Sequence, residues 1–474
     1  MAAVLIFTGF LWVMPDAFAA DPFAANNGLY PTAQEWQGPY RVSNYNYPET
    51  AESAWLKKLE DLRQKQPQLR GKLTPDTAGL YVDALKQFLE PSMEAMIDRP
   101  DKFDPAATNW YSMPWTGEGS PTSTGATDST SGREAILGSF SGQVIQGSSF
   151  KLQAMAMMLK TGQQMQLAYP DLLADMQNHT VIYYDPVAAL MLRKVWADPL
   201  NPNARAADFP EGALVIKAGA VTATESQWPV VKGSAIWHVF RPPFQPYNDP
   251  NPPSNTPKVT ELRVLQFDAI VKDSIASPDT GWVFITWVYK FNAPGPRPWD
   301  RLVALGAMWG NDPELAQYPD GVGPSGKLQE TWINPDAPDY ARKTLGWGGR
   351  LSGPIDVSLR HGIVFTNGQI PGSGVRASSC MSCHGTSQYP FVANLYPSPN
   401  KIFPKDGDTF LLYPPGSREW SWWFANRPGK EAQNKANDVS AVGLDYDMLL
   451  TFALSNFNNA SGHPALVQPR FRVH

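Results

Sequence analysis

Two cysteines and a histidine lie together in one short motif. Cys380 and Cys383 are three positions apart, and His384 follows directly. Thiols at this spacing can each add to one vinyl group of a porphyrin, and the next residue can then supply an imidazole nitrogen to the iron. The sequence therefore predicts one haem c, bound covalently through Cys380 and Cys383, with His384 as the proximal ligand of the iron.

A close cysteine pair can also be a redox-active dithiol or half of a zinc site. A zinc site needs two more cysteines or histidines at compatible spacing. The chain has two cysteines in all, both in this motif, so that no cysteine is left for such a site or for a structural disulfide elsewhere. The motif therefore favours haem over zinc.

The second axial position of the iron decides what such a haem does. A methionine or histidine there gives a six-coordinate electron carrier, whereas an open position admits a small ligand. After the motif the candidates for this ligand are Met448 and His463. Met448 also has the helical spacing of a core residue, and His463 lies on an expected loop where a histidine is usually solvated. Candidates before the motif are His361, His238, His179, Met308 and Met113.

Haem propionates need hydrogen-bond donors, and one segment after the motif is rich in them. Residues 418–423 and Arg427 supply guanidinium and indole N–H groups close together in the sequence. The same composition is typical of a tryptophan-rich core stretch flanked by solvated arginines. Both interpretations stay open from the sequence.

The composition and the N-terminal residues limit where the protein can be located and what it can bind. The net charge is -5 and no block of like charges occurs, which argues against nucleic-acid binding. Residues 1–20 contain an apolar run, a proline and a small-residue site, which predicts a signal peptide, although no lysine or arginine precedes the run. The run is too short to cross a bilayer. We expect a periplasmic or secreted protein without a transmembrane anchor in its mature chain.

The first part of the chain predicts helices. After an irregular arm over residues 21–50, apolar residues recur at helical spacing over 51–66 and over 75–97, the second helix being broken near Pro91. A further helix is expected over 150–167. Residues 117–132 are rich in glycine, serine and threonine and indicate a surface loop.

The middle of the chain predicts strands. Short stretches rich in valine, isoleucine, tryptophan and phenylalanine are separated by proline and asparagine clusters, and apolar residues alternate in part over 262–271. An antiparallel sandwich or barrel-like sheet is expected over about 209–310. The stretches are 213–224, 234–240, 260–272, 282–291 and 302–309.

These patterns together predict an α+β fold. We expect a signal peptide over 1–20, a mainly helical region over 21–208, an antiparallel β domain over 209–345, and a haem-binding segment over 346–474. The last segment is expected to be mostly loop and helix, with a closing helix over 444–457. Its glycine-rich start over 346–374 cannot form the leading helix of a small cytochrome c, so the segment is expected to lean on the sheet.

Several stretches resemble a family of large bacterial single-haem proteins described as cytochrome c family proteins. The resemblance covers most of the mature chain and implies export and haem binding through Cys380, Cys383 and His384, but it implies no particular activity. The approach to the haem motif over 355–377 is longer here than is usual in the family. The matching stretches are 110–115, 132–134, 209–217, 281–284, 298–303, 308–313, 349–354 and 379–384.

Two functions follow from one covalent haem. The first is electron transfer to or from a redox partner protein, because no second cofactor motif and no hydrolase or nicotinamide motif is present. The second is a haem-dependent oxidoreductase acting on peroxide or a small substrate, because the chain is far longer than a bare carrier needs. A ligand-sensing protein is a third class that no residue specifically favours.

Overall fold

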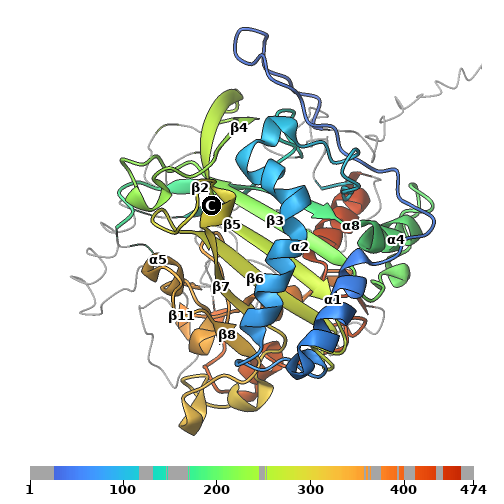
Figure 1. The fold of residues 1–474 in the computed structure, drawn as a ribbon, viewed down its shortest axis with the longest axis vertical. Helices are drawn as coiled ribbons and strands as arrows, with labels where there is room; N and C mark the ends of the chain where they lie inside the picture. Colours follow the sequence, from blue (N-terminus) through green and yellow to red (C-terminus); the bar gives the residue numbers. More distant parts are fainter. Residues whose placement is uncertain are drawn as a thin grey trace, which may run out of the picture.

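A computed structural model gives the fold of most of the chain (Figure 1). The expected signal peptide, the expected helix over 150–167, His361 and His463 lie outside the residues it describes. The described residues are 26–116, 132–145, 147, 169, 171–244, 251, 254–356, 359–360, 363–364, 375–391, 394–399, 411–433 and 441–460.

One large antiparallel sheet forms the middle of the molecule. Its strands run in the order β1-β2-β3-β5-β6-β7-β8, and β4 pairs with the first half of the long strand β5. The strands are β1 (Phe140–Ile145), β2 (Met176–Tyr184), β3 (Leu214–Val221), β4 (Ile236–Arg241), β5 (Lys258–Lys272), β6 (Trp282–Tyr289), β7 (Leu302–Met308) and β8 (Thr331–Ile333).

The two faces of this sheet carry different layers, because side chains alternate along each strand. On β6, Val283, Ile285 and Trp287 belong to the core shared with α1 (Ala54–Lys65) and α2 (Ala78–Asp98). Both helices lie across this face in Figure 1.

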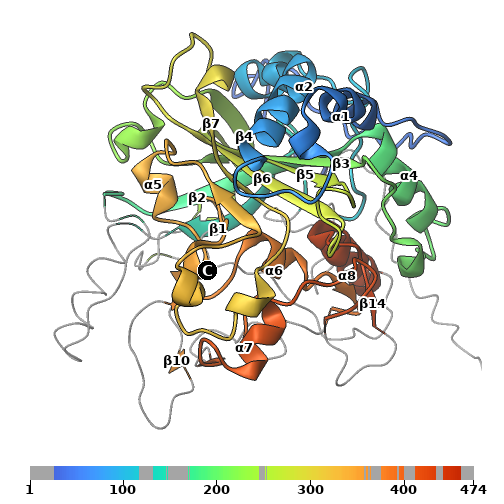
Figure 2. The ribbon, with the colours of Figure 1, turned by 60° about the horizontal axis from the view of Figure 1, so that its bottom comes forward.

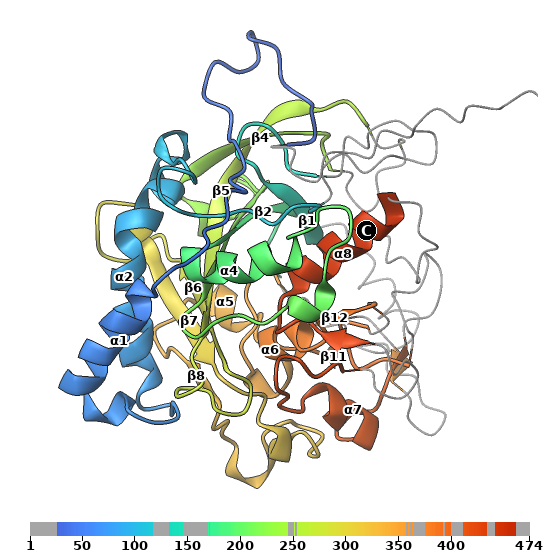
Figure 3. The same cartoon turned by 90° about the vertical axis from the view of Figure 1, so that its right-hand side faces the viewer.

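The second core lies on the opposite face of the sheet and receives the C-terminal segment. Trp282 and Phe284 of β6 belong to it, and Figures 2 and 3 show the C-terminal helices on the far side of the sheet from α1 and α2. Residues of α4 (Pro186–Val195), α6 (Cys380–His384) and α8 (Met448–Ala460) contribute to this core, and Ala341 of α5 (Asp339–Arg342) does too. The helix α7 (Arg418–Trp423) packs in a smaller cluster with Trp347 and Phe424.

Short pieces complete the fold. Two-residue strands pair as β9 (Leu359–Arg360) with β11 (Val375–Arg376), β10 (Ile363–Val364) with β13 (Leu411–Leu412), and β12 (Gln388–Tyr389) with β14 (Val442–Gly443). Single 3₁₀ turns cover Pro67–Leu69, Pro100–Lys102, Ala204–Ala206, Pro229–Val231, Trp299–Arg301, Pro313–Leu315, Gly323–Ser325 and Trp347–Gly349.

The α+β class and the five predicted strands are confirmed, but three details differ. The sheet is open and includes β1 and β2, which fall in the region expected to be mainly helical. Its faces are covered by helices and loops, and the described residues contain no second sheet of comparable size. The strand β2 escaped prediction because its first residues, Gln177, Asn178 and His179, hide the apolar signal.

The predicted break at Pro91 is wrong, because α2 runs through it. A proline inside a helix removes one hydrogen bond and costs about 3 kcal/mol. Leu85 and Leu89 before the proline, and Met93 and Ile97 after it, are all buried in the core on the sheet. Burying a large apolar side chain stabilises by about 1.5–3 kcal/mol, so that continuing the helix is favoured.

None of the helices in the described part of the chain is both long and apolar enough to cross a membrane.

Candidate functional site

The cysteine–histidine motif forms a short helix, α6, whose start is fixed by a serine. Ser379 is the N-cap, and its Oγ accepts a hydrogen bond from the backbone N–H of Ser382 at 3.0 Å. The Ser382 hydroxyl lies 2.8 Å from the backbone nitrogen of Ser379, which completes a capping box. The N–H of Cys380 donates to the carbonyl of Leu351 at 2.9 Å. The helix is therefore held at its first turn.

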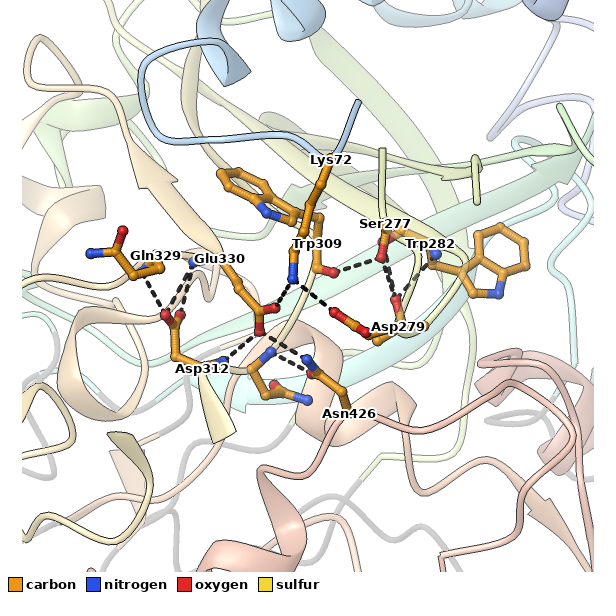
Figure 4. Close-up of polar contacts among 11 residues, drawn as sticks. Lys72, Ser277, Asp279, Trp282, Trp309, Asp312, Gln329, Glu330 and Asn426 are labelled. Atoms are coloured by element: carbon orange, nitrogen blue, oxygen red, sulfur yellow. Dashed lines mark hydrogen bonds and ion pairs between the residues drawn. The ribbon is translucent and has the colours of Figure 1, made fainter. Parts of the chain in front are cut away.

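A polar network reaches this N-cap from four parts of the chain, and Figure 4 shows its section around Lys72, Glu330 and Asn426. The Ser379 hydroxyl donates to Asn311 Oδ1 at 3.0 Å, and the Asn311 N–H donates to Asn426 Oδ1 at 2.8 Å. Asn426 Nδ2 in turn donates to the Glu330 carboxylate at 2.9 Å, which also pairs with Lys72 Nζ at 2.7 Å. The network ties the start of α6 to the sheet edge and to the segment before α2.

The orientation of the His384 ring shows which of its nitrogens could bind a metal. Its Nδ1 lies 2.8 Å from the backbone carbonyl oxygen of Tyr446, which can only accept a hydrogen bond, so Nδ1 is the protonated nitrogen. Burial lowers the pKa of His384 to about 4, which keeps the ring neutral at pH 7. Nε2 therefore carries a lone pair, the state that a metal-binding histidine needs. The ring of Phe284 on β6 packs edge-on against it at 5.0 Å.

The Tyr446 carbonyl is itself held in place by the sheet. Asp445 and Tyr446 both adopt the left-handed backbone conformation, with φ of 49° and 66°. The buried Asp445 carboxylate accepts hydrogen bonds from the Trp282 indole at 2.8 Å, the Phe209 N–H at 2.8 Å and Lys272 Nζ at 2.7 Å. Because these partners belong to the sheet and the loop leading into it, the sheet fixes the acceptor of His384.

The two thiols are not joined in a disulfide, and both side chains are partly exposed. Burial, together with the charges of Asp356 and Asp268, raises the pKa of the Cys380 thiol well above its usual value. Among the described residues no group of three or more histidine, cysteine, aspartate or glutamate side chains could hold a metal ion by itself. The donor set fits a haem, which brings its own iron ligands and needs only one histidine here.

A charged cluster that the sequence analysis missed lies on the sheet near Cys380. Lys217 Nζ contacts Asp356 at 2.6 Å and Asp268 at 3.5 Å. Gln266 Nε2 donates to Asp268 at 2.7 Å, and the Thr286 hydroxyl donates to the same carboxylate at 2.7 Å. Burial raises the pKa of Asp268 to about 6. The available signal was a lysine and an aspartate inside otherwise apolar strands.

Met448 lies close to the haem motif, as the first residue of α8. Its sulfur is 3.7 Å from the Thr386 hydroxyl, two residues after His384, and it packs with Phe391 and Phe452. The core role expected from its helical spacing is thus observed, and the same position brings its thioether near α6. His361 and His463, the other two candidate distal ligands, lie outside the described residues.

The candidate distal ligands that precede the motif in the sequence lie on other elements. Met308 and Met113 are buried in the second core. His179 is buried on β2, where desolvation lowers its pKa to about 3. His238 lies on β4 with its ring against Trp36 at 5.2 Å. Met308 and Met113 share this core with Met381 of α6, whereas His179 and His238 lie on strands β2 and β4.

The tryptophan-rich segment is mostly core. In α7, Trp420 is fully buried and packs against Trp347 at 5.1 Å, whereas Arg418 is exposed. Arg427 is buried over the Trp422 ring at 4.3 Å and donates to backbone carbonyls. Its Nε has no acceptor among the described residues, so one donor is available for an anionic group. Of the proposed propionate donors, Trp420 Nε1 and Arg427 Nε are both buried without an acceptor among the described residues.

Comparison with known proteins adds no assignment: no family model, no curated protein and no solved structure matches this chain. The case for its function therefore rests on the residues and their geometry.

Proposed function

We propose that this protein is an exported c-type cytochrome that carries one covalent haem and transfers electrons in the periplasm. Cys380 and Cys383 would form the two thioether links, and His384 Nε2 would bind the iron. When bound, the haem supplies a one-electron couple between ferric and ferrous iron. The chain supplies the attachment, the axial nitrogen and a largely buried surrounding.

The orientation of His384 is the observation that carries this proposal. Any neutral histidine has one unprotonated ring nitrogen, and without a fixed partner either nitrogen can be the one. Here the hydrogen bond from Nδ1 to the Tyr446 carbonyl, at 2.8 Å, selects that tautomer, and Asp445 holds the carbonyl against the sheet. Metal-binding histidines are oriented by such a partner on their other nitrogen.

Electron transfer is favoured over catalysis by what surrounds the motif. Met381 of α6 is fully buried in the second core, and Phe284 covers the ring of His384. Burial of this kind limits solvent around a redox centre, which is one of the means by which a protein sets its potential. The nearby Met448 thioether supplies a candidate sixth ligand of the type found in electron carriers.

Absorption and magnetic circular dichroism spectra of the purified full-length protein test this role, after co-expression with a haem-attachment system. We expect a low-spin ferric spectrum with a methionine or bis-histidine signature and no change when carbon monoxide is added to the reduced protein. Met448→Leu keeps a similar volume, and loss of a methionine signature in it would identify the ligand. A high-spin ferric iron that binds carbon monoxide on reduction would contradict the carrier role and favour the oxidoreductase.

A further inference from the structure

A cavity of about 290 Å³ lies away from the haem motif, where four segments meet. They are the N-terminal arm, the end of α2 with the turn after it, the loop before β1, and β4. The arm, the end of α2 and β4 come together at the upper end of the molecule in Figures 1 and 3. The residues that decide its chemistry are Trp36 and Arg41 from the arm, Asp98 and Asp101, Leu137 before β1, and His238 on β4.

Arg41 is a buried cation without a hydrogen-bond acceptor. The residue is 9% exposed and lines the cavity, and its guanidinium donates to no described group. Three acids lie near it, and each has another partner: Glu134 accepts hydrogen bonds from its own loop, Asp104 from the turn that follows it, and Asp101 pairs with Lys102 at 3.1 Å. The guanidinium lies over the Phe103 ring, 5.6 Å from its centroid, which offsets only part of the cost of burying the charge, and burial lowers the pKa of Arg41. The arginine is thus prepared for an anion from outside the chain.

Asp98 is the complementary group at the end of α2. One carboxylate oxygen, Oδ1, accepts the N–H of Trp299 at 2.7 Å, whereas the buried Oδ2 has no donor among the described residues. Burial raises the pKa of Asp98 to about 6, so that it is mostly ionised at pH 7. Arg41 and Asp98 both line this cavity. The cavity therefore holds one unsatisfied donor group and one unsatisfied acceptor.

The remaining wall is apolar and aromatic. Leu137 is buried, and Ile236 of β4 is 46% exposed at the cavity. The ring of Trp36 covers His238 with their centroids 5.2 Å apart. Small-molecule sites typically combine such a wall with a few polar groups that fix orientation.

We propose that this cavity binds a free α-amino acid with an apolar side chain, as its zwitterion. The carboxylate would pair with the Arg41 guanidinium, the ammonium with the Asp98 carboxylate, and the side chain would lie against Trp36 and Leu137. A phosphate or other multiply charged anion fits poorly, because Asp98 and Asp101 also line the cavity. The proposal does not depend on the haem, so its failure and that of the electron-transfer role are separate.

Isothermal titration calorimetry of the full-length haem-loaded protein with valine, leucine, isoleucine, methionine and phenylalanine tests the proposal. We expect at least one to bind at millimolar concentration or better. For leucine, the amide, which lacks the carboxylate, and 4-methylpentanoate, which lacks the amine, should each bind about tenfold or more weakly than the amino acid, because each leaves a buried charge unpaired. Inorganic phosphate should not compete.

Variants show whether the two charges act as proposed. Arg41→Gln and Asp98→Asn should each weaken binding about tenfold or more, whereas Arg193→Gln, at an exposed arginine paired with Glu49, should leave it unchanged. Arg41→Gln removes the contact with the Phe103 ring but no side-chain hydrogen bond to a described group, so the variant should fold with only a small fall in its melting temperature, and the amino acid should raise that temperature only where Arg41 is present. No binding by any of the five amino acids, equal binding of 4-methylpentanoate, or unchanged binding by Arg41→Gln would overturn the proposal.

Discussion

At the scale of single residues, one backbone carbonyl gives the histidine its role. The spacing of Cys380, Cys383 and His384 was enough to predict a haem-attachment motif from the sequence, because attachment to a porphyrin requires that spacing. The Tyr446 carbonyl could not be found in the same way. A backbone acceptor has no sequence signature, and this one lies 62 residues after the histidine. Arg41 and Asp98 escaped for a similar reason, since only the fold shows that neither side chain has its hydrogen bonds satisfied.

Single substitutions in the motif should separate attachment from ligation. Cys380→Ser and Cys383→Ser should each keep one thioether, and His384→Ala should keep both while losing the axial nitrogen. We expect denaturing mass spectrometry to show bound haem in all three, and the spectrum to become high-spin only in His384→Ala. His238→Ala, at a histidine on β4, is the matched control and should keep the wild-type spectrum. A wild-type spectrum in His384→Ala would exclude this residue as the ligand.

Asp185 gives a prediction on pH and stability. It caps α4, accepting hydrogen bonds from the N–H groups of Ala188 at 2.7 Å and Leu214 at 3.1 Å, and burial raises its pKa from 3.8 to about 7. A raised carboxyl pKa means that the folded state prefers the protonated form. Its contribution to stability is full below about pH 4 and is lost as the pH rises through about 7.

The matching variant is Asp185→Asn, which keeps a side-chain oxygen for both N–H groups but does not titrate. Denaturant unfolding should show the free energy of unfolding of the wild type falling relative to that of the variant between about pH 4 and pH 7. Other titrating groups are the same in both proteins, so the difference isolates Asp185. A difference that stays constant over this range would show that the carboxyl pKa is not raised.

At the scale of elements, long periodic segments were predictable and short capped ones were not. Helices α1 and α2 follow from their apolar spacing, and the strands β3 to β7 from their apolar, β-branched and aromatic residues. The closing helix was predicted from residue 444, but α8 begins at Met448, because Asp445 and Tyr446 have positive φ and Asp447 caps the helix. Caps and left-handed residues form through local hydrogen bonds that apolar periodicity does not report.

The cap of α6 can be tested against a matched cap elsewhere. Ser417 caps α7 as Ser379 caps α6, its Oγ accepting the Trp420 N–H at 3.1 Å. Ser379→Ala and Ser417→Ala should each cost about 1 kcal/mol of stability, measured by denaturant unfolding. Only Ser379→Ala should also change the visible spectrum, because it loosens the first turn of the motif. Identical spectra in both variants would show that the cap does not position the haem ligands.

At the scale of the whole molecule, the C-terminal segment and the sheet form one structural unit. The sequence suggested this from the glycine-rich approach to the motif, and the structure supplies the contacts. Lys272, Trp282 and Phe209 hold Asp445, the Tyr184 hydroxyl donates to the Asp447 carboxylate at 2.9 Å, and Phe284 covers His384. The full extent of the sheet was not predicted from the sequence. Polar residues in β1 and β2 interrupt the apolar pattern by which strands are recognised.

A fragment test follows from this dependence. Residues 346–474 expressed alone should fail to fold into a haem protein, because they lack the sheet that holds the Tyr446 loop and covers α6. Circular dichroism and the visible spectrum of the fragment, beside those of the full-length protein, provide the measurement. Asp445→Asn in the full chain is a milder change, because it should weaken the contacts that hold the Tyr446 loop on the sheet without removing the sheet. A well-folded fragment with the wild-type haem spectrum would show that the segment is an independent domain.

The most direct test of the account is the mass of the full-length protein under denaturing conditions, after co-expression with a haem-attachment system, combined with the pyridine haemochrome spectrum. We predict a mass increase equal to one haem per chain and a haemochrome band typical of two thioether links, both absent from the Cys380→Ser, Cys383→Ser double variant. An unmodified mass with both thiols still reactive toward an alkylating reagent would contradict the central claim.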